Sequence, residues 1–342
     1  MAVGQYFLAA EHFLTNTDNP ALENAVTTLT GSHGQVKGLN ISLEKHGAFY
    51  HPLKITVKSN DNHGCTLVLN GAVDRPGLDL VEQECQLMAD LGAAVTPCCL
   101  PKVFGAGRQK IRGMETAFFL GEWLEGFYEF HVTRTGKKEG IAVWGKNLQD
   151  LSYETAAPLY EQAAHILTLY YDVSTGASIF PWHHGAGDFV VNPTAAGLPV
   201  RLITARGFSP LAETKSCKDA RLPSLLFFFL CTILRMRLDR LDGTGPAVFL
   251  KKQVAQASVN GFFKALAGKA EAGPGQSAMD KGFFQDLPEI FHEFILNFSS
   301  DQLEAITARM VNSWHAGPSE YDLIQKNIRG HTNEISRILK NR

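Results

Sequence analysis

The period of the hydrophobic positions changes along this chain and predicts where its helices and strands lie. In residues 1–32 apolar side chains recur at helical spacing, which indicates an N-terminal helical region. Apolar and polar residues then alternate with period two in 39–43 and in 53–57, on either side of a turn at 45–47, which predicts a β-hairpin. A third strand is predicted at 65–69, after a second turn.

A helix, two more strands and then mostly helices are expected to follow. Helical spacing in 78–91 predicts one helix, and short apolar runs at 102–104 and 116–120 predict strands. Helical spacing dominates the second half of the chain, apart from two predicted strands at 189–191 and 200–203. Antiparallel strands with one helix, followed by a helical region, make an α+β fold.

Three local signals refine the helical region. The longest apolar run, residues 222–234, has 13 residues, whereas about 20 are needed to cross a bilayer, so it predicts a buried helix. Ser299 and Gln302 have the spacing of a capping box at the start of a helix. Residues 267–278 are rich in Gly, Ala and Ser, which predicts a mobile loop.

The charge and cysteine content narrow the function classes. The chain has 32 Lys and Arg against 34 Asp and Glu, and no dense basic run, so we expect no nucleic-acid or membrane partner. The first residues lack the basic and apolar segments of a secretory signal. The six cysteines show no CxxC spacing. We therefore expect a cytoplasmic protein.

Three segments carry a resemblance to a known family. Residues 115–126, ETAFFLGEWLEG, are similar to a last strand that runs into a hinge. Residues 181–193, PWHHGAGDFVVNP, resemble a catalytic loop with the pattern HGDxHPGNILVDP. Residues 200–207, VRLITARG, resemble the strand and metal-binding D-F/W-G segment that follow that loop. The family is the protein kinase-like superfamily, and the likeness is closer to its aminoglycoside phosphotransferase and choline kinase branch.

The resemblance implies a protein kinase-like two-lobed fold. Residues 1–32 would be an N-terminal helical extension. Residues 33–126 would form a small β-rich lobe, with an antiparallel sheet and one helix, that ends in a hinge. Residues 127–342 would form the larger, mostly helical C-lobe. In this family the two lobes bind ATP and magnesium, and both are implied here only as weakly bound cofactors, because the usual ligand positions are altered.

The implied nucleotide-binding positions lie in the small lobe. Asn70 stands where the family has a lysine, and an amide cannot supply the charge that a lysine brings to a phosphate. Glu84, with Glu82 as the alternate, stands where the family has the partner of that lysine. Without the lysine, Glu84 is expected to be a solvated helix charge. Glu122 in the hinge segment is the other implied cofactor-binding residue, and the hairpin turn has Gly47 alone instead of GxGxxG.

The implied catalytic and metal positions lie in the second and third segments. Asp188 matches a magnesium-binding asparagine, and its carboxylate is a suitable ligand for a hard cation. His183 matches the catalytic aspartate, and its imidazole can accept a proton near neutral pH. Thr204 matches the second metal-ligating aspartate, which a neutral hydroxyl replaces poorly. Arg206 supplies positive charge either to a phosphate or to a neighbouring carboxylate.

The loop from Trp182 to Asp188 has three alternative interpretations. It is a tight Gly-rich turn whose histidines bond backbone carbonyls, or part of a degenerate nucleotide or substrate pocket. The third alternative is a transition-metal site formed by His183, His184 and Asp188.

Three functions follow from these replacements. The first is a kinase-like protein with a degenerate active site that is non-catalytic and serves as a regulatory or scaffold protein. The alternative is an atypical ATP-dependent small-molecule phosphotransferase, with His183 as base, Asp188 on magnesium and Arg206 on phosphate. The third is a ligand-binding protein that keeps the cleft between the lobes for another molecule. The partner is an unidentified small molecule or protein in each case.

Overall fold

The chain divides into two compact units, which are described separately below. The computed structural model describes residues 3–32, 36–44, 50–59, 64–136, 138–145, 148–182, 184–211, 220–272, 283–314 and 317–342. Unit 1 comprises Met1–Glu125 and Thr204–Arg206, and unit 2 comprises Gly126–Ile203 and Gly207–Arg342. The fold is α+β, as predicted, and it includes an antiparallel sheet of five strands.

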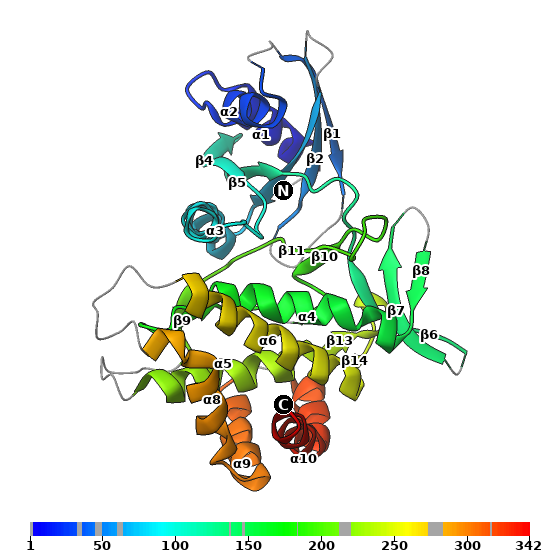
Figure 1. The fold of residues 1–342 in the computed structure, drawn as a ribbon. Coiled ribbons are helices and arrows are strands. Elements are labelled where there is room, and N and C mark those ends of the chain that lie inside the picture. Colours follow the sequence, from blue (N-terminus) through cyan, green and yellow to red (C-terminus); the bar gives the residue numbers. More distant parts are fainter. Residues whose placement is uncertain are drawn as a thin grey trace. The chain divides into compact units, whose positions relative to one another are not determined.

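Unit 1 is built on this five-stranded sheet, whose strand order is β1-β2-β3-β5-β4 (Figure 1). The strands predicted from period-two alternation and short apolar runs are confirmed, and β2 alternates buried and more exposed positions along its length. The turn predicted at 45–47 lies outside the described residues. The strands are β1 Val36–Leu43, β2 Leu53–Ser59, β3 Cys65–Ala72, β4 Val103–Ile111 and β5 Met114–Glu122.

Three helices cover the sheet of unit 1: α1 Val3–Thr15, α2 Ala21–Thr30 and α3 Arg75–Ala94. The region predicted to be helical thus contains two helices, and both contact β4. Phe13 of α1 packs against Phe118 of β5 with ring centroids 5.6 Å apart, so α1 contributes to the core of this unit. Helix α3 starts three residues before the predicted 78–91 because a proline in its first turn needs no hydrogen-bond acceptor there.

Six helices form most of the described part of unit 2 (Figure 1). The apolar run at 222–234 is a buried helix, as predicted, because its aromatic side chains pack against those of neighbouring helices. The ring of Phe229 lies 4.8 Å from Phe262 and 5.7 Å from Phe291. None of the described helices is both long and apolar enough to cross a membrane. The helices are α4 Tyr153–Leu169, α5 Arg221–Met236, α6 Lys252–Ala272, α8 Leu287–Leu296, α9 Ser300–Asn312 and α10 Pro318–Lys340.

Two local predictions in unit 2 have opposite outcomes. The capping box is confirmed. The Ser299 hydroxyl accepts from the backbone N–H of Gln302 at 3.2 Å, and the side-chain oxygen of Gln302 accepts from the backbone N–H of Ser299 at 2.8 Å. The mobile loop predicted at 267–278 is wrong for its first part, because α6 continues to Ala272. Alanines favour helix and compensate for Gly268. Residues 273–278 lie outside the described part of the chain.

Unit 2 also contains short antiparallel strands, and most of them were not predicted. The predicted strands at 189–191 and 200–203 are β10 and β11, which pair with each other. The sequence indicated no strand between 127 and 150, yet three lie in or across this region. The alternation expected of a strand is missing in β7, because Ile141, Ala142 and Val143 are buried consecutively. The strands are β6 Phe130–Thr135, β7 Lys138–Trp144, β8 Leu148–Leu151, β9 Ala177–Ile179, β10 Phe189–Val191, β11 Val200–Leu202, β12 Phe208–Pro210, β13 Leu238–Arg240 and β14 Ala247–Phe249.

Candidate functional site

Glu84 lies on the buried face of α3 and is the centre of a polar cluster in unit 1. Its side chain is almost completely buried, with 1% of its surface exposed. The expectation of a solvated helix charge is therefore wrong. The physical reason is its spacing, because Glu84 follows Val81 by three positions and precedes Met88 by four, so all three share one face of the helix. The alternate residue, Glu82, instead binds Arg108 at the surface.

Neutral groups satisfy the buried carboxylate. The Tyr50 hydroxyl donates to Oε2 of Glu84, and the Thr204 hydroxyl donates to Oε1. The backbone N–H of Ala205 also donates to Oε1, at 3.3 Å. A buried carboxylate costs several kcal/mol unless its oxygens are hydrogen-bonded, so these three donors keep the cluster intact.

The pKa values of this cluster depend on opposing effects. Burial raises the pKa of the Glu84 carboxyl above its usual range, although the hydrogen bonds from Thr204 and Tyr50 and the positive charge of Arg206 oppose this shift. Burial, and then the neighbouring Glu84 carboxylate, raise the pKa of the Tyr50 hydroxyl. Tyr50 therefore remains a neutral donor at any physiological pH. The charge of Arg206 thus acts on a neighbouring carboxylate, which is one of the two roles expected for this arginine.

Asn70 and Glu122 lie on the central strands of the same sheet. Asn70 of β3 is opposite Phe119 of β5, and the ring of Tyr50 packs edge-on against Phe119 with centroids 6.1 Å apart. The side chain of Glu122 accepts from the backbone N–H of Lys102 at 3.1 Å, so it closes the end of the β4–β5 ladder. Tyr50 was not predicted, and its donation to Glu84 is the contact that the resemblance implied for a lysine at position 70.

The loop residues lie in unit 2. Asp188 is 3% exposed, and its backbone carbonyl accepts from the N–H of Ile203 at 3.0 Å. The described part of the loop contains a turn, because the N–H of Gly187 donates to the carbonyl of His184 at 3.2 Å, but no bond from a histidine ring to a backbone carbonyl is established there. Nε2 of His184 lies 3.4 Å from a carboxylate oxygen of Glu320 in α10. His183 lies outside the described residues.

The donor set of the cluster does not fit ATP and magnesium well. Both oxygens of Glu84 already accept hydrogen bonds, and the Thr204 hydroxyl donates its proton to one of them. A threonine in this role offers magnesium no anionic oxygen. Among the described residues, which do not include His183, no group of three or more His, Cys, Asp and Glu side chains could hold a metal ion.

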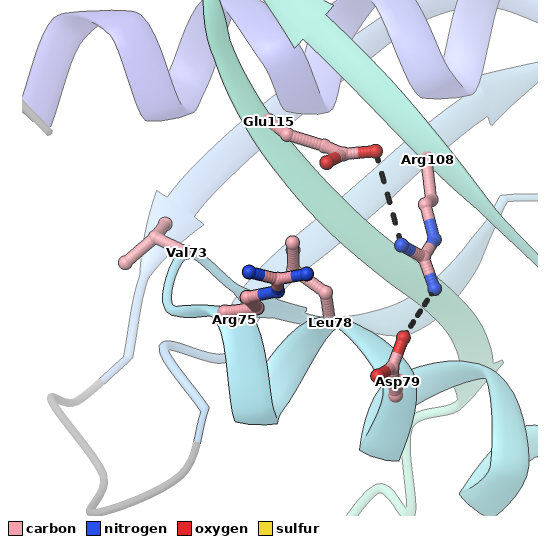
Figure 2. A pocket seen from close by; sticks show the side chains of 6 residues that line it. All are labelled: Val73, Arg75, Leu78, Asp79, Arg108 and Glu115. Carbon is pink, nitrogen blue, oxygen red and sulfur yellow. Dashed lines mark hydrogen bonds and ion pairs between the residues drawn. The ribbon is translucent and has the colours of Figure 1, made fainter.

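A cavity of about 460 Å³ lies beside α3 in unit 1, and Arg108 pairs there with the two acidic residues of the lining. Figure 2 shows Arg108 between Glu115 and Asp79. Arg108 donates to Asp79 at 2.7 Å and to Glu82 at 2.9 Å, and lies 3.8 Å from Glu115. These ion pairs tie α3 to β4 and β5, and so help to hold the helix that carries Glu84. The remaining lining residues are Val73, Arg75 and Leu78.

A second buried polar cluster, which the sequence did not reveal, lies in unit 2. Asp239 is fully buried and accepts from Nδ1 of His131 at 3.0 Å and from the backbone N–H of Val132 at 2.7 Å. The N–H of Arg240 donates to the same carboxylate at 2.7 Å. Asp239 and His131 are separated by 108 positions in sequence, so no local pattern could have paired them. The pair fastens β6 to β13.

Comparison of the chain with protein-family models and with curated proteins found no match.

Proposed function

We propose that the chain is a kinase-like protein that does not transfer phosphate, and that it acts as a regulatory, scaffold or ligand-binding protein. One observation carries this proposal: the buried carboxylate of Glu84 is satisfied by the hydroxyls of Tyr50 and Thr204. In an active kinase-like site this glutamate orients a lysine on the nucleotide phosphates. Here Glu84 is hydrogen-bonded by neutral hydroxyl groups, which bring no positive charge to a phosphate.

The order of elements in unit 1 supports the kinase-like part of the proposal. Five antiparallel strands in the order β1-β2-β3-β5-β4, with a single long helix between β3 and β4, fit the small lobe of that superfamily. In unit 2, the turn at Gly187 leads into the hairpin β10–β11, as the resemblance requires of a catalytic loop. The boundary between the units follows Glu125, at the end of the segment similar to a hinge.

The chemistry of the replaced positions supports the non-catalytic part. Phosphoryl transfer depends on cations and metal ions that neutralise developing negative charge. Asn70 brings no charge, and the hydroxyl of Thr204 is already used by Glu84. Asp188 alone retains a carboxylate suited to magnesium. A single carboxylate without the lysine and the second acid gives weak magnesium binding and no effective clamp on a phosphate.

Thermal unfolding of the full chain with ATP and magnesium tests this proposal. We expect ATP plus magnesium to give the same melting temperature as ATP without the metal. A rise in melting temperature that requires both would contradict the proposal. ATP turnover that is lost in Asp188→Ala, but kept in the matched surface variant Asp286→Ala, would establish the atypical phosphotransferase instead.

A further inference from the structure

A second cavity, of about 500 Å³, lies in unit 2, where the first turns of α4 and α6 and the start of β7 meet. It is separate from the Glu84 cluster and plays no part in the proposed function. Its polar lining contains hydroxyl, amide, ammonium and carboxylate groups on three elements. The lining residues are Lys138, Glu139, Ser152, Tyr153, Glu154, Lys251 and Gln253.

The two glutamates of this cavity already have partners. Glu139 accepts from the guanidinium of Arg134 at 2.9 Å and from the hydroxyl of Tyr153 at 2.9 Å. Glu154 accepts from the side-chain amide of Gln253 at 2.8 Å and lies in the first turn of α4, where the helix dipole stabilises a negative charge. Arg134 thus compensates the charge of Glu139, whereas Glu154 has neutral hydrogen-bond partners and the nearby positive charge of Lys251.

The two lysines differ from the glutamates in this respect. Among the described residues, neither Lys138 nor Lys251 forms an ion pair. The ammonium of Lys251 lies over the ring of Tyr153, 4.8 Å from its centroid, and this contact directs it toward the cavity wall. The two lysines balance the two glutamates of the lining, and Arg134, which pairs with Glu139, adds one positive charge beside the cavity.

We propose that this cavity binds a small phosphate monoester through Lys138 and Lys251. The volume accommodates a phosphate with a short organic group, and a dianion gains from two ammonium groups at once. The hydroxyl oxygen of Tyr153, whose proton is donated to Glu139, can still accept a hydrogen bond from the organic part. Two lysines act as point charges, so the site would select charge more strongly than shape.

Isothermal titration calorimetry of the full chain with glycerol 3-phosphate and with inorganic phosphate tests this inference, with glycerol and sodium chloride of equal ionic strength as controls. We expect saturable binding of glycerol 3-phosphate, weaker binding of phosphate and none of glycerol. Removal of one charge-assisted contact should weaken binding about tenfold, in Lys251→Gln as in Lys138→Gln. The matched variant Lys264→Gln, on α6 and outside the lining, should bind as the wild type does.

Two outcomes would overturn the inference. One is the absence of saturable binding of either anion, and the other is equal loss of affinity in Lys264→Gln and Lys251→Gln. Because all three lysines are exposed, the melting temperatures of the three variants without ligand should match that of the wild type. ATP binding that needs no metal and disappears in the double variant Lys138→Gln/Lys251→Gln would support the inference that this cavity binds phosphate groups.

Discussion

The substitution Thr204→Val removes one donor from the buried Glu84 carboxylate and keeps the shape of the side chain. Glu84 is 1% exposed and Thr204 is 8% exposed, so solvent does not replace the lost bond or screen the charge. A hydrogen bond to a charged group contributes about 2 kcal/mol, and the N–H of Ala205 still donates to the same oxygen. We expect the free energy of unfolding of unit 1 to fall by about 2 kcal/mol at neutral pH.

A double-mutant cycle separates this effect from the loss of packing. In a Glu84→Gln background the Thr204 hydroxyl faces a neutral amide, so Thr204→Val should cost only about 1 kcal/mol. Urea unfolding followed by hydrogen–deuterium exchange of α3 and β5 peptides measures the stability of unit 1 itself. Thr204→Ser, which keeps the hydroxyl, is the control. Equal costs of Thr204→Val in both backgrounds, or equal costs of the Ser and Val variants, would refute the reasoning.

Two further predictions concern pH and the core. Because the folded pKa of Glu84 is raised, its contribution to stability is fully present below the unfolded pKa and is lost as pH rises through the folded pKa. The free energy of unfolding of Glu84→Gln should therefore increase relative to that of the wild type as pH rises through the folded pKa of Glu84. Curves of unfolding free energy against pH that are parallel for the two proteins would contradict this. Phe229→Ala should cost about 4 kcal/mol by chemical denaturation, because its ring is fully buried. The exposed Leu296→Ala on α8 is its control, and comparable losses in the two variants would contradict the assignment of the core.

Local patterns were sufficient to predict most elements of unit 1 and the long helices of unit 2. Alternation identified β2, and helical spacing identified α3, because each pattern has one buried face. The same reasoning failed for β7, whose buried residues are consecutive. It also failed at the end of α6, where glycine and serine content suggested a loop although alanines continue the helix. Composition was thus a poorer guide than spacing.

The candidate site was predictable only in part. The spacing of Glu84 from Val81 and Met88 predicts its burial, whereas the absence of a lysine at position 70 favours an exposed carboxylate, and the spacing is the better guide. Its true partners could not be read from the sequence, since Tyr50 and Thr204 are 34 and 120 positions away. Contacts over such separations are set by the tertiary fold.

The replacements around Glu84 are chemically consistent with one another. The buried carboxylate of Glu84 accepts hydrogen bonds from the neutral hydroxyls of Tyr50 and Thr204, and the positive charge of Arg206 also acts on it. Thr204 occupies the position at which the resemblance implies an acid, and an acid there would repel Glu84. Asparagine at position 70 and threonine at position 204 are thus both compatible with a buried Glu84 carboxylate. A cluster of this kind stabilises α3 against its neighbours in unit 1.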